Sequence, residues 1–242
     1  MHFVLIHGGA HGAWCWQPLL EHLDAPALAV DLPGRAGRPG DLEALAVRDF
    51  AAAVVEDIEK AGLSRVVLVG HSMAGLTIPL VLERIPERIA SVVFVSCVLP
   101  REGQSVLDAI ATPESQRPRS PGDGLLEERA REMFCNDMDE AQTRFVLERL
   151  CPESVRVMNE PARTAGLRLP VPRCYVKLLR DQALAPAIQD EAIGNAGPGC
   201  AVHELDAGHN VMISRPRELA HILNRVARAG AGDAADGAAR RR

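Results

Sequence analysis

Short apolar runs alternate with longer segments of helical periodicity along most of this chain. The apolar runs predict β-strands near residues 2–6, 26–30, 65–69, 90–96, 172–179 and 199–205. The periodic segments predict helices near residues 13–23, 41–61, 73–84, 183–194 and 216–228. Strands that alternate with helices favour an α/β fold with a mostly parallel, doubly wound sheet, which binds ligands at the carboxyl ends of its strands.

The alternation stops after the strand near 90–96, and no further strand pattern follows until about residue 170. This interval contains two helical patterns and a Pro-rich piece, at residues 125–135, 139–150 and 112–124. We interpret residues 101–169 as a helical cap inserted over the active site of a core formed by residues 1–100 and 170–229. The tail at 230–242 is made of Gly, Ala, Asp and Arg with little to bury, so we expect it to be disordered.

A cap of this kind excludes water and supplies most of the surface that contacts a substrate. Its apolar side chains are available to line a pocket: Leu107, Ile110, Met133, Phe134, Phe145, Leu147 and Met158. We select Met133 and Phe134 as substrate-binding candidates. For any single one of these residues, packing inside the cap is the competing interpretation.

The turn Gly70-His71-Ser72-Met73-Ala74-Gly75 lies between an apolar run and a helical segment. A tight turn from a strand into a helix projects a serine hydroxyl clear of the backbone, as in the G-x-S-x-G nucleophile elbow. Ala74 replaces the last glycine of that pattern, and Gly75 follows one residue later. Ser72 is therefore the candidate nucleophile, and an ordinary helix N-cap serine is the alternative.

A general base is expected on a loop at the same edge of the sheet. His209 follows the last predicted strand, whereas the histidines at 2, 203, 22 and 221 fall within strand or helical patterns. Asp181 follows the strand near 172–179 and can orient the histidine; Asp206, only three residues before His209, is the rival. The chain order Ser72, Asp181, His209 is that of α/β-hydrolase triads.

The glycine-rich loop His7-Gly8-Gly9-Ala10-His11-Gly12 follows the first predicted strand. Glycines let backbone amides approach a ligand closely. The amides of Gly9 and Met73 are our candidates for an oxyanion hole that binds the negative oxygen of a tetrahedral intermediate. The glycine spacing fits neither a dinucleotide nor a P-loop motif, which argues against a nucleotide site.

The segment from His7 to Trp16 resembles the opening of the plant methylesterase and hydroxynitrile lyase branch of the α/β-hydrolases and its bacterial esterase relatives. The resemblance extends through Asp31-Leu32-Pro33-Gly34, the Ser72 turn, Arg180-Asp181 and Gly208-His209. It implies a triad of Ser72, His209 and Asp181 with an oxyanion hole at Gly9 and Met73. It also implies that His11 borders the pocket, although a loop-stabilising hydrogen bond is an equal alternative.

Two positions separate the chemistries of this branch. The cyanohydrin-cleaving members are known for a threonine after the first loop histidine and a lysine after the catalytic histidine, but Gly8 and Asn210 stand there. The resemblance therefore favours an esterase that acts through an acyl-enzyme. Two alternatives stay open: a lyase, cyclase or thioester-releasing enzyme with the same pocket, and a receptor-like binding protein.

Composition agrees with an enzyme that acts on a small-molecule ester without a metal or organic cofactor. The 242 residues are 47% hydrophobic, enough for one domain with a large core. A net charge of −5 gives no reason to expect nucleic acid or membrane partners. The six cysteines indicate reduced thiols, and the strand at residue 2 leaves no room for a signal peptide, so we expect a cytoplasmic protein. The oligomeric state stays open, a homodimer included.

Overall fold

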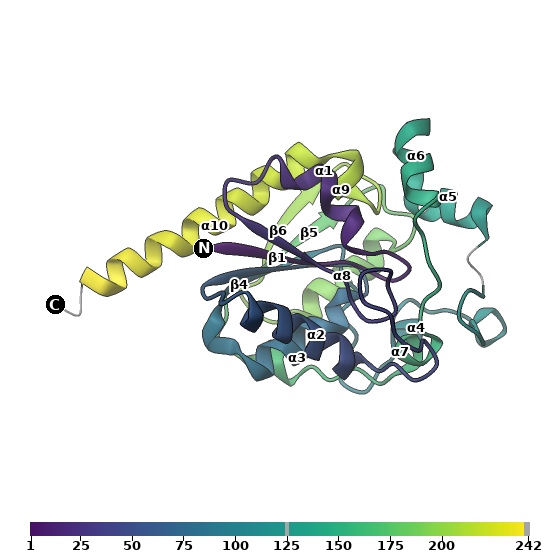
Figure 1. Ribbon diagram of the computed structural model, residues 1–242, viewed down its shortest axis with the longest axis horizontal. Helices are drawn as coiled ribbons and strands as arrows, with labels where there is room; N and C mark the ends of the chain where they lie inside the picture. Colours follow the sequence, from purple (N-terminus) through teal and green to yellow (C-terminus); the bar gives the residue numbers. More distant parts are fainter. Residues whose placement is uncertain (124–125, 240–242) are drawn as a thin grey trace.

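A six-stranded sheet forms the centre of the computed structural model, which describes residues 1–123 and 126–239 (Figure 1). The strands are β1 (His2–Ile6), β2 (Ala27–Val30), β3 (Val66–His71), β4 (Ile89–Val95), β5 (Arg173–Leu178) and β6 (Ala201–Leu205). They lie in the order β2-β1-β3-β4-β5-β6, and every neighbouring pair is parallel. The predicted fold class, a doubly wound α/β sheet, is confirmed.

The side chains of the inner strands alternate between two buried cores because successive residues of a strand point to opposite faces. On β3, Val66 and Leu68 belong to one core, and Val67 and Val69 belong to the other. All four are fully buried. This two-sided burial explains why the sequence of β3 is a continuous apolar run instead of an alternating one.

Helices cover both faces of the sheet (Figure 1). One face carries α2 (Val47–Lys60), α3 (Ala74–Arg84) and α8 (Pro186–Asn195). The other carries a 3₁₀ turn at Ala13–Trp16, α1 (Gln17–Leu20), α9 (Val211–Ser214) and α10 (Pro216–Ala239). A short 3₁₀ turn at Pro86–Arg88 leads into β4.

The helix predicted at 41–61 begins later, at Val47. The preceding residue Ala46 is extended, and its amide donates to the Asp49 carboxylate at 2.9 Å. Asp41 closes a separate turn by accepting the amide of Glu43 at 3.0 Å. Local side-chain bonds of this kind compete with helix formation, so the apolar pattern alone placed the start too early.

The interval between β4 and β5 contains short helices and, within residues 101–123 and 126–169, no strand. These elements are α4 (Val106–Ala109), α5 (Glu127–Cys135), α6 (Glu140–Leu147), α7 (Val155–Asn159) and 3₁₀ turns at Glu114–Gln116 and Ala165–Arg168. In Figure 1, α4, α5, α6 and α7 lie beyond the carboxyl ends of the strands, whereas the turn at Ala165–Arg168 packs against α3. We keep the name cap for residues 101–169, whose role as a cap stays a prediction. Residue 124, the end of the Pro-rich piece, and residue 125, the predicted helix start, lie outside the described residues.

The expectation of a disordered tail differs from the structure over residues 230–239. There α10 continues without a break to Ala239, and its last turns project beyond the sheet (Figure 1). Alanine has the highest helix propensity, and adding residues to an existing helix avoids the cost of a new nucleus. Residues 240–242 lie outside the described residues.

The cysteines are free thiols, as the sequence predicts. Cys15, Cys97, Cys135 and Cys174 are buried, and Cys151 and Cys200 are half-buried. Across the described ranges, no helix combines the length and the apolar character that crossing a bilayer requires.

The cap and α3 meet at Gly166, which predicts a specific cost for added volume. A Cβ atom at Gly166 would lie 2.0 Å from the carbonyl oxygen of Pro79, and backbone cannot yield as a side chain can. We expect Gly166→Ala to lower the free energy of unfolding by about 1–3 kcal/mol, measured by urea denaturation. Gly194→Ala in α8 meets nothing within 4 Å and should raise it by up to about 1 kcal/mol. Equal effects in the two variants would contradict the close approach at Gly166.

Candidate active site

Ser72 lies in a strained turn between β3 and α3. Its φ angle is +54°, a left-handed conformation that non-glycine residues rarely adopt. Three backbone bonds hold the turn. The amide of Ser72 donates to the carbonyl of Val95 at 3.2 Å, and its carbonyl accepts from the amides of Val98 at 3.0 Å and Gly75 at 3.3 Å. The predicted nucleophile therefore has the conformation of an elbow and not of a regular helix N-cap.

The small residues around Ser72 explain the departure from the elbow pattern. A Cβ at Gly75 would lie 2.0 Å from the carbonyl oxygen of Val98, so Gly75 is the position that cannot carry a side chain. A Cβ at Gly70 would lie 3.1 Å from the Ala74 methyl group. Gly70 thus leaves the space that the Ala74 methyl group occupies.

The predicted base and acid are in contact. His209 Nδ1 lies 2.7 Å from Asp181 Oδ2, and both residues are only 2% exposed. Asp181 follows β5 and His209 follows β6, neighbouring strands that bring their loops together. The rival Asp206 points to solvent and pairs with Arg180 Nε at 3.0 Å. The geometry therefore selects Asp181 as the partner of His209.

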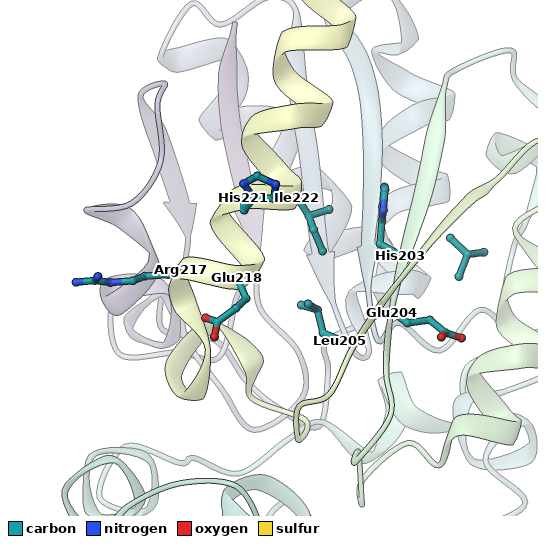
Figure 2. A pocket seen from close by; sticks show the side chains of 8 residues that line it. His203, Glu204, Leu205, Arg217, Glu218, His221 and Ile222 are labelled. Atoms are coloured by element: carbon teal, nitrogen blue, oxygen red, sulfur yellow. The ribbon is translucent and has the colours of Figure 1, made fainter.

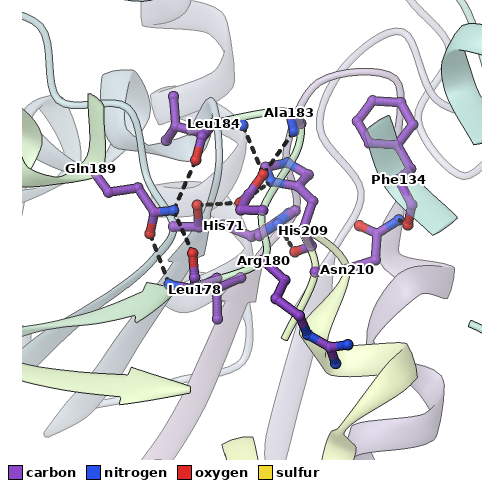
Figure 3. Close-up of polar contacts among 12 residues, drawn as sticks. His71, Phe134, Leu178, Arg180, Ala183, Leu184, Gln189, His209 and Asn210 are labelled. Atoms are coloured by element: carbon purple, nitrogen blue, oxygen red, sulfur yellow. Dashed lines mark hydrogen bonds and ion pairs between the residues drawn. The ribbon is translucent and has the colours of Figure 1, made fainter. Parts of the chain in front are cut away.

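Four hydrogen bonds hold the Asp181 carboxylate. The amides of Ala183 and Leu184 donate to Oδ1 at 2.8 and 2.7 Å (Figure 3), and Ser96 Oγ donates to Oδ2 at 2.7 Å. Burial raises the pKa of Asp181, but the charge of His209 and the hydrogen bonds from His209, Leu184 and Ser96 outweigh it, so the pKa is lowered. Sequence reasoning missed Ser96; its position directly after a buried strand was the available signal.

The two residues that carry the predicted oxyanion donors are neighbours. A Cβ at Gly9 would lie 3.5 Å from Met73 Sδ, and both residues line the same cavity as Ser72. Within the described residues, neither the Gly9 nor the Met73 amide donates to a protein acceptor. The glycine at residue 8 lets this loop pack against Ser72, because a Cβ at Gly8 would lie 2.7 Å from Ser72 Cβ. Unbonded amides at these positions are what the predicted oxyanion hole requires.

His11 does not line the cavity, which corrects its assignment as a substrate-binding residue. It is 1% exposed, and its Nδ1 donates to the carbonyl oxygen of Gly9 at 2.7 Å. Its ring stacks on Trp14 at 5.4 Å and meets the edge of Phe134 at 5.0 Å, measured between centroids. The loop-stabilising hydrogen bond is thus the role that the structure gives it.

Two further buried histidines form hydrogen bonds with the backbone of the loops around the site. His7 Nδ1 donates to the Gly8 carbonyl at 2.8 Å while its Nε2 accepts from the Leu32 amide at 3.2 Å, a pattern that requires a neutral ring. His71 Nε2 donates to the carbonyl of His209 at 3.0 Å. Burial, with the charge of Arg35, lowers the pKa of His7 to about 3, and burial places that of His71 well below its usual range.

A cavity of about 220 Å³ is lined by most of the predicted catalytic and oxyanion-hole residues. Ser72, His209, Gly9 and Met73 line it together with apolar residues of the cap, which are Leu107, Ile110, Met133, Phe134 and Met158. Met133 and Phe134 thus lie where the sequence analysis expected substrate contacts. Phe145 and Leu147 pack elsewhere in the cap, Phe145 against Trp14.

A larger, more open depression of about 830 Å³ lies between β6 and α10 (Figure 2). Its lining includes His203, Glu204, Arg217 and Glu218, and none of the predicted site residues. The smaller cavity is the candidate site, because it is lined by the strained Ser72 and by His209, whose ring is bonded to the buried Asp181.

Two buried carboxylates escaped the sequence analysis. Glu153 and the side chain of Asp137, both in the cap, are 7% and 1% exposed. Glu153 pairs with Arg35, which is 3% exposed. The periodic pattern gives no signal for either, because buried charges are expected only where a partner is known. Within residues 1–123 and 126–239, no group of three or more His, Cys, Asp or Glu side chains could hold a metal ion.

The chain belongs to the alpha/beta hydrolase family, whose sequence model matches residues 3–222. Among curated proteins it is 28% identical to "Esterase PIR7B" of Oryza sativa subsp. japonica, over 93% of this chain and 95% of that protein. It is 27% identical to "Salicylic acid-binding protein 2" of Nicotiana tabacum, over 93% of this chain and 96% of that protein.

Solved structures agree on the fold. The extracellular alpha/beta-hydrolase of a Paenibacillus species superposes with a TM-score of 0.83 at 23% identity, over 93% of this chain and 98% of that one. Plant esterases and methylesterases recur among the relatives, so the predicted branch of the family is confirmed. The comparisons also confirm the predicted enzyme class, a carboxylic ester hydrolase of the α/β-hydrolase fold.

The neutral histidines predict that stability falls in mild acid. The folded pKa values of His7 and His11, about 3 and about 4, lie below the unfolded value of about 6.5, so the unfolded chain binds more protons between these limits. The contribution of these histidines to the free energy of unfolding is complete above about pH 6.5 and is lost as the pH falls toward 4. Each histidine contributes at most about 1.4 kcal/mol per pH unit.

Urea unfolding at pH 7, 6 and 5 measures this slope. The glutamine in His7→Gln can still donate and accept hydrogen bonds but does not titrate, so this variant should reduce the slope of the free energy of unfolding against pH by the contribution of one histidine. The exposed His221→Gln is the control and should leave the slope unchanged. A pH-independent free energy of unfolding across this range would contradict the prediction.

Proposed function

We propose that this protein is a serine hydrolase that cleaves a carboxylic ester of a small apolar metabolite through an acyl-enzyme intermediate. One observation carries the proposal: Ser72 and His209 line one cavity, and Nδ1 of His209 is bonded to the buried Asp181. Because Nδ1 faces the carboxylate, Nε2 is the ring nitrogen that can accept a proton from Ser72. No hydrogen bond joins the Ser72 hydroxyl to His209 within the described residues, and such bonds often tighten only when substrate is bound.

In the first half of the reaction, the Ser72 oxygen attacks the ester carbonyl while His209 Nε2 takes the hydroxyl proton. The carbonyl oxygen becomes an oxyanion and is bound by the free amides of Gly9 and Met73. When the intermediate collapses, the imidazolium of His209 returns the proton to the departing alcohol. Asp181 stabilises that imidazolium and keeps the ring in the required orientation.

In the second half, His209 removes a proton from water, and the resulting hydroxide attacks the acyl-enzyme carbonyl. The same two amides bind the second oxyanion, and collapse releases the carboxylic acid and restores Ser72. The chain supplies every proton donor and acceptor in this scheme, so the reaction needs no metal or organic cofactor.

The lining of the cavity supports an apolar substrate of modest size. The walls come from Leu107, Ile110, Met133, Phe134 and Met158, and the volume is about 220 Å³. Side chains such as Thr112, Gln116 and Arg129 contribute a polar part of the lining. A small or cyclic apolar acyl or alcohol group would bury its surface against these walls.

Asn210 supports hydrolysis over cyanohydrin cleavage. Its side chain is fully buried and donates through Nδ2 to the carbonyl of Phe134 at 3.3 Å, in the cap. It is not among the residues that line the cavity. Position 210 therefore offers no cation to a departing group, as cleavage of cyanide would require.

Ser72→Ala should lower kcat on p-nitrophenyl esters by about 10⁴-fold or more, because the nucleophile is lost. Asp181→Asn should lower kcat comparably by orienting the wrong tautomer of His209. Wild type should show a pre-steady-state burst of p-nitrophenol that is absent in Ser72→Ala. The exposed Ser64→Ala is the control. Unchanged turnover in Ser72→Ala, with circular dichroism showing a folded protein, would remove Ser72 from the mechanism.

The cavity wall predicts a change in selectivity. Ile110→Trp narrows the cavity and should lower kcat/KM for p-nitrophenyl benzoate roughly tenfold relative to the acetate. Phe145→Leu, a cap change outside the cavity, should leave this ratio unchanged. If Ile110→Trp affects both esters equally, the bulky group does not bind against this wall.

A further inference from the structure

The cap contacts the core at the two loops that carry the proposed chemistry. Cap residues 151–153 meet the loop after β1, which carries Gly9. Cap residues 136 and 137 meet the loop after β6, which carries His209. Each contact contains a buried carboxylate that receives a backbone amide next to a predicted catalytic group.

Glu153 holds the oxyanion loop. Its Oε2 accepts the amide of Ala10 at 3.1 Å and is paired with Arg35, while its Oε1 accepts the amide of Ser154 at 2.8 Å. Ala10 has a φ angle of +59°, so the loop is held in a conformation that an alanine rarely adopts. The amide of Cys151 donates to the carbonyl of Ala10 at 3.0 Å, so the cap bonds both polar groups of this residue.

Arg35 completes the contact from the core. Its Nε donates to the carbonyl of His11 at 2.6 Å, two residues after Gly9. The Arg35–Glu153 pair thus bonds the loop at Ala10 and at His11. Because the pair is neutral overall and buried, it fixes these groups without placing net charge beside the developing oxyanion.

Asp137 holds the histidine loop in a similar way. Its Oδ2 accepts the amide of Gly208 at 2.8 Å and the hydroxyl of Ser214 at 2.9 Å, on either side of His209. A Cβ at Gly208 would lie 2.4 Å from Asn136 Oδ1 and 2.6 Å from Asp137 Oδ1, so the loop backbone packs directly on the cap.

We propose that Glu153 and Asp137 are positioning residues, through which the cap holds the Gly9 amide and the His209 ring in their reactive places. This inference rests on the proposed function for its effect on catalysis. Holding reacting groups within a fraction of an ångström of their productive geometry has a large effect on rate, and a displacement of about 1 Å can cost about a hundredfold. The cap therefore acts on the chemical step as well as on substrate choice.

The kinetic test uses Glu153→Gln and Asp137→Asn in the full chain, with p-nitrophenyl acetate, whose acyl group is too small to need the cap. Each variant should lower kcat roughly tenfold to a hundredfold with KM changed less than twofold. Asp139→Asn is the matched control, because Asp139 caps α6 in the same cap and touches neither loop. Its kcat should equal that of wild type.

The structural test is hydrogen exchange of the backbone amides. Glu153→Gln should speed exchange in residues 8–12 and leave 208–214 unchanged, and Asp137→Asn should do the reverse. Asp139→Asn should change neither segment. This readout does not require ester turnover, so it tests the holding contacts even if wild type and Ser72→Ala are equally inactive and the proposed function fails.

Three outcomes would overturn the inference. Wild-type kcat in both variants would show that the contacts do not position the site. A rise in KM at constant kcat would make the carboxylates substrate contacts, which matters for Glu153 because it also lines the cavity. Exchange that is unchanged, or faster throughout the protein, would remove the specific link to each loop.

A second variant addresses misfolding of Glu153→Gln. The double variant Arg35→Met/Glu153→Leu replaces the buried pair by apolar side chains, a change that often preserves stability. It should fold, as judged by Tm, and still show the low kcat, because the amide of Ala10 has lost its acceptor. Full activity in this variant would also overturn the inference.

Discussion

The buried hydrogen bond between Asp181 and His209 is the interaction on which the site depends. A carboxylate that is 2% exposed is stable as an anion only when its oxygens are fully bonded, and Ser96, Ala183, Leu184 and His209 satisfy that requirement. These partners come from the ends of β4, β5 and β6, so the parallel order of the sheet is what assembles them. The order of the strands is therefore what allows the Asp181 carboxylate to be buried as an anion.

Backbone strain is concentrated at the same edge of the sheet. Five non-glycine residues of the described chain have a positive φ angle, and Ala10, Ser72 and Ser96 follow β1, β3 and β4 in the site. Each strained residue brings a polar group to its place: an amide held by the cap, the hydroxyl of the proposed nucleophile, and the hydroxyl that bonds Asp181. Such conformations persist because the surrounding hydrogen bonds and close packing determine them.

Sequence reasoning predicted the six strands and the main helices, and it selected Ser72, Asp181 and His209, because apolar period and loop position are local signals. The structure brings these three residues to one edge of the sheet, and their catalytic roles stay a prediction. It could not place His11, whose ring direction depends on packing against Trp14 and Phe134. Glu153 and Asp137 were missed for a similar reason: their partners are amides far away in the sequence, at Ala10 and Gly208. The start of α2 was misplaced because side-chain bonds to Asp41 and Asp49 compete with the apolar pattern.

The cap leaves the core after β4 and returns at β5, and these two strands are neighbours in the sheet. An insertion whose ends emerge side by side can be exchanged for one of another length without altering any strand register, which makes this region a natural module for grafting new specificity. The hydrogen bonds that Glu153 and Asp137 accept from the amides of Ala10 and Gly208 set a condition on such a graft. A foreign cap that fits the strand ends but lacks groups to meet these two loops would leave two backbone amides without acceptors, and the chimera would need compensating residues there.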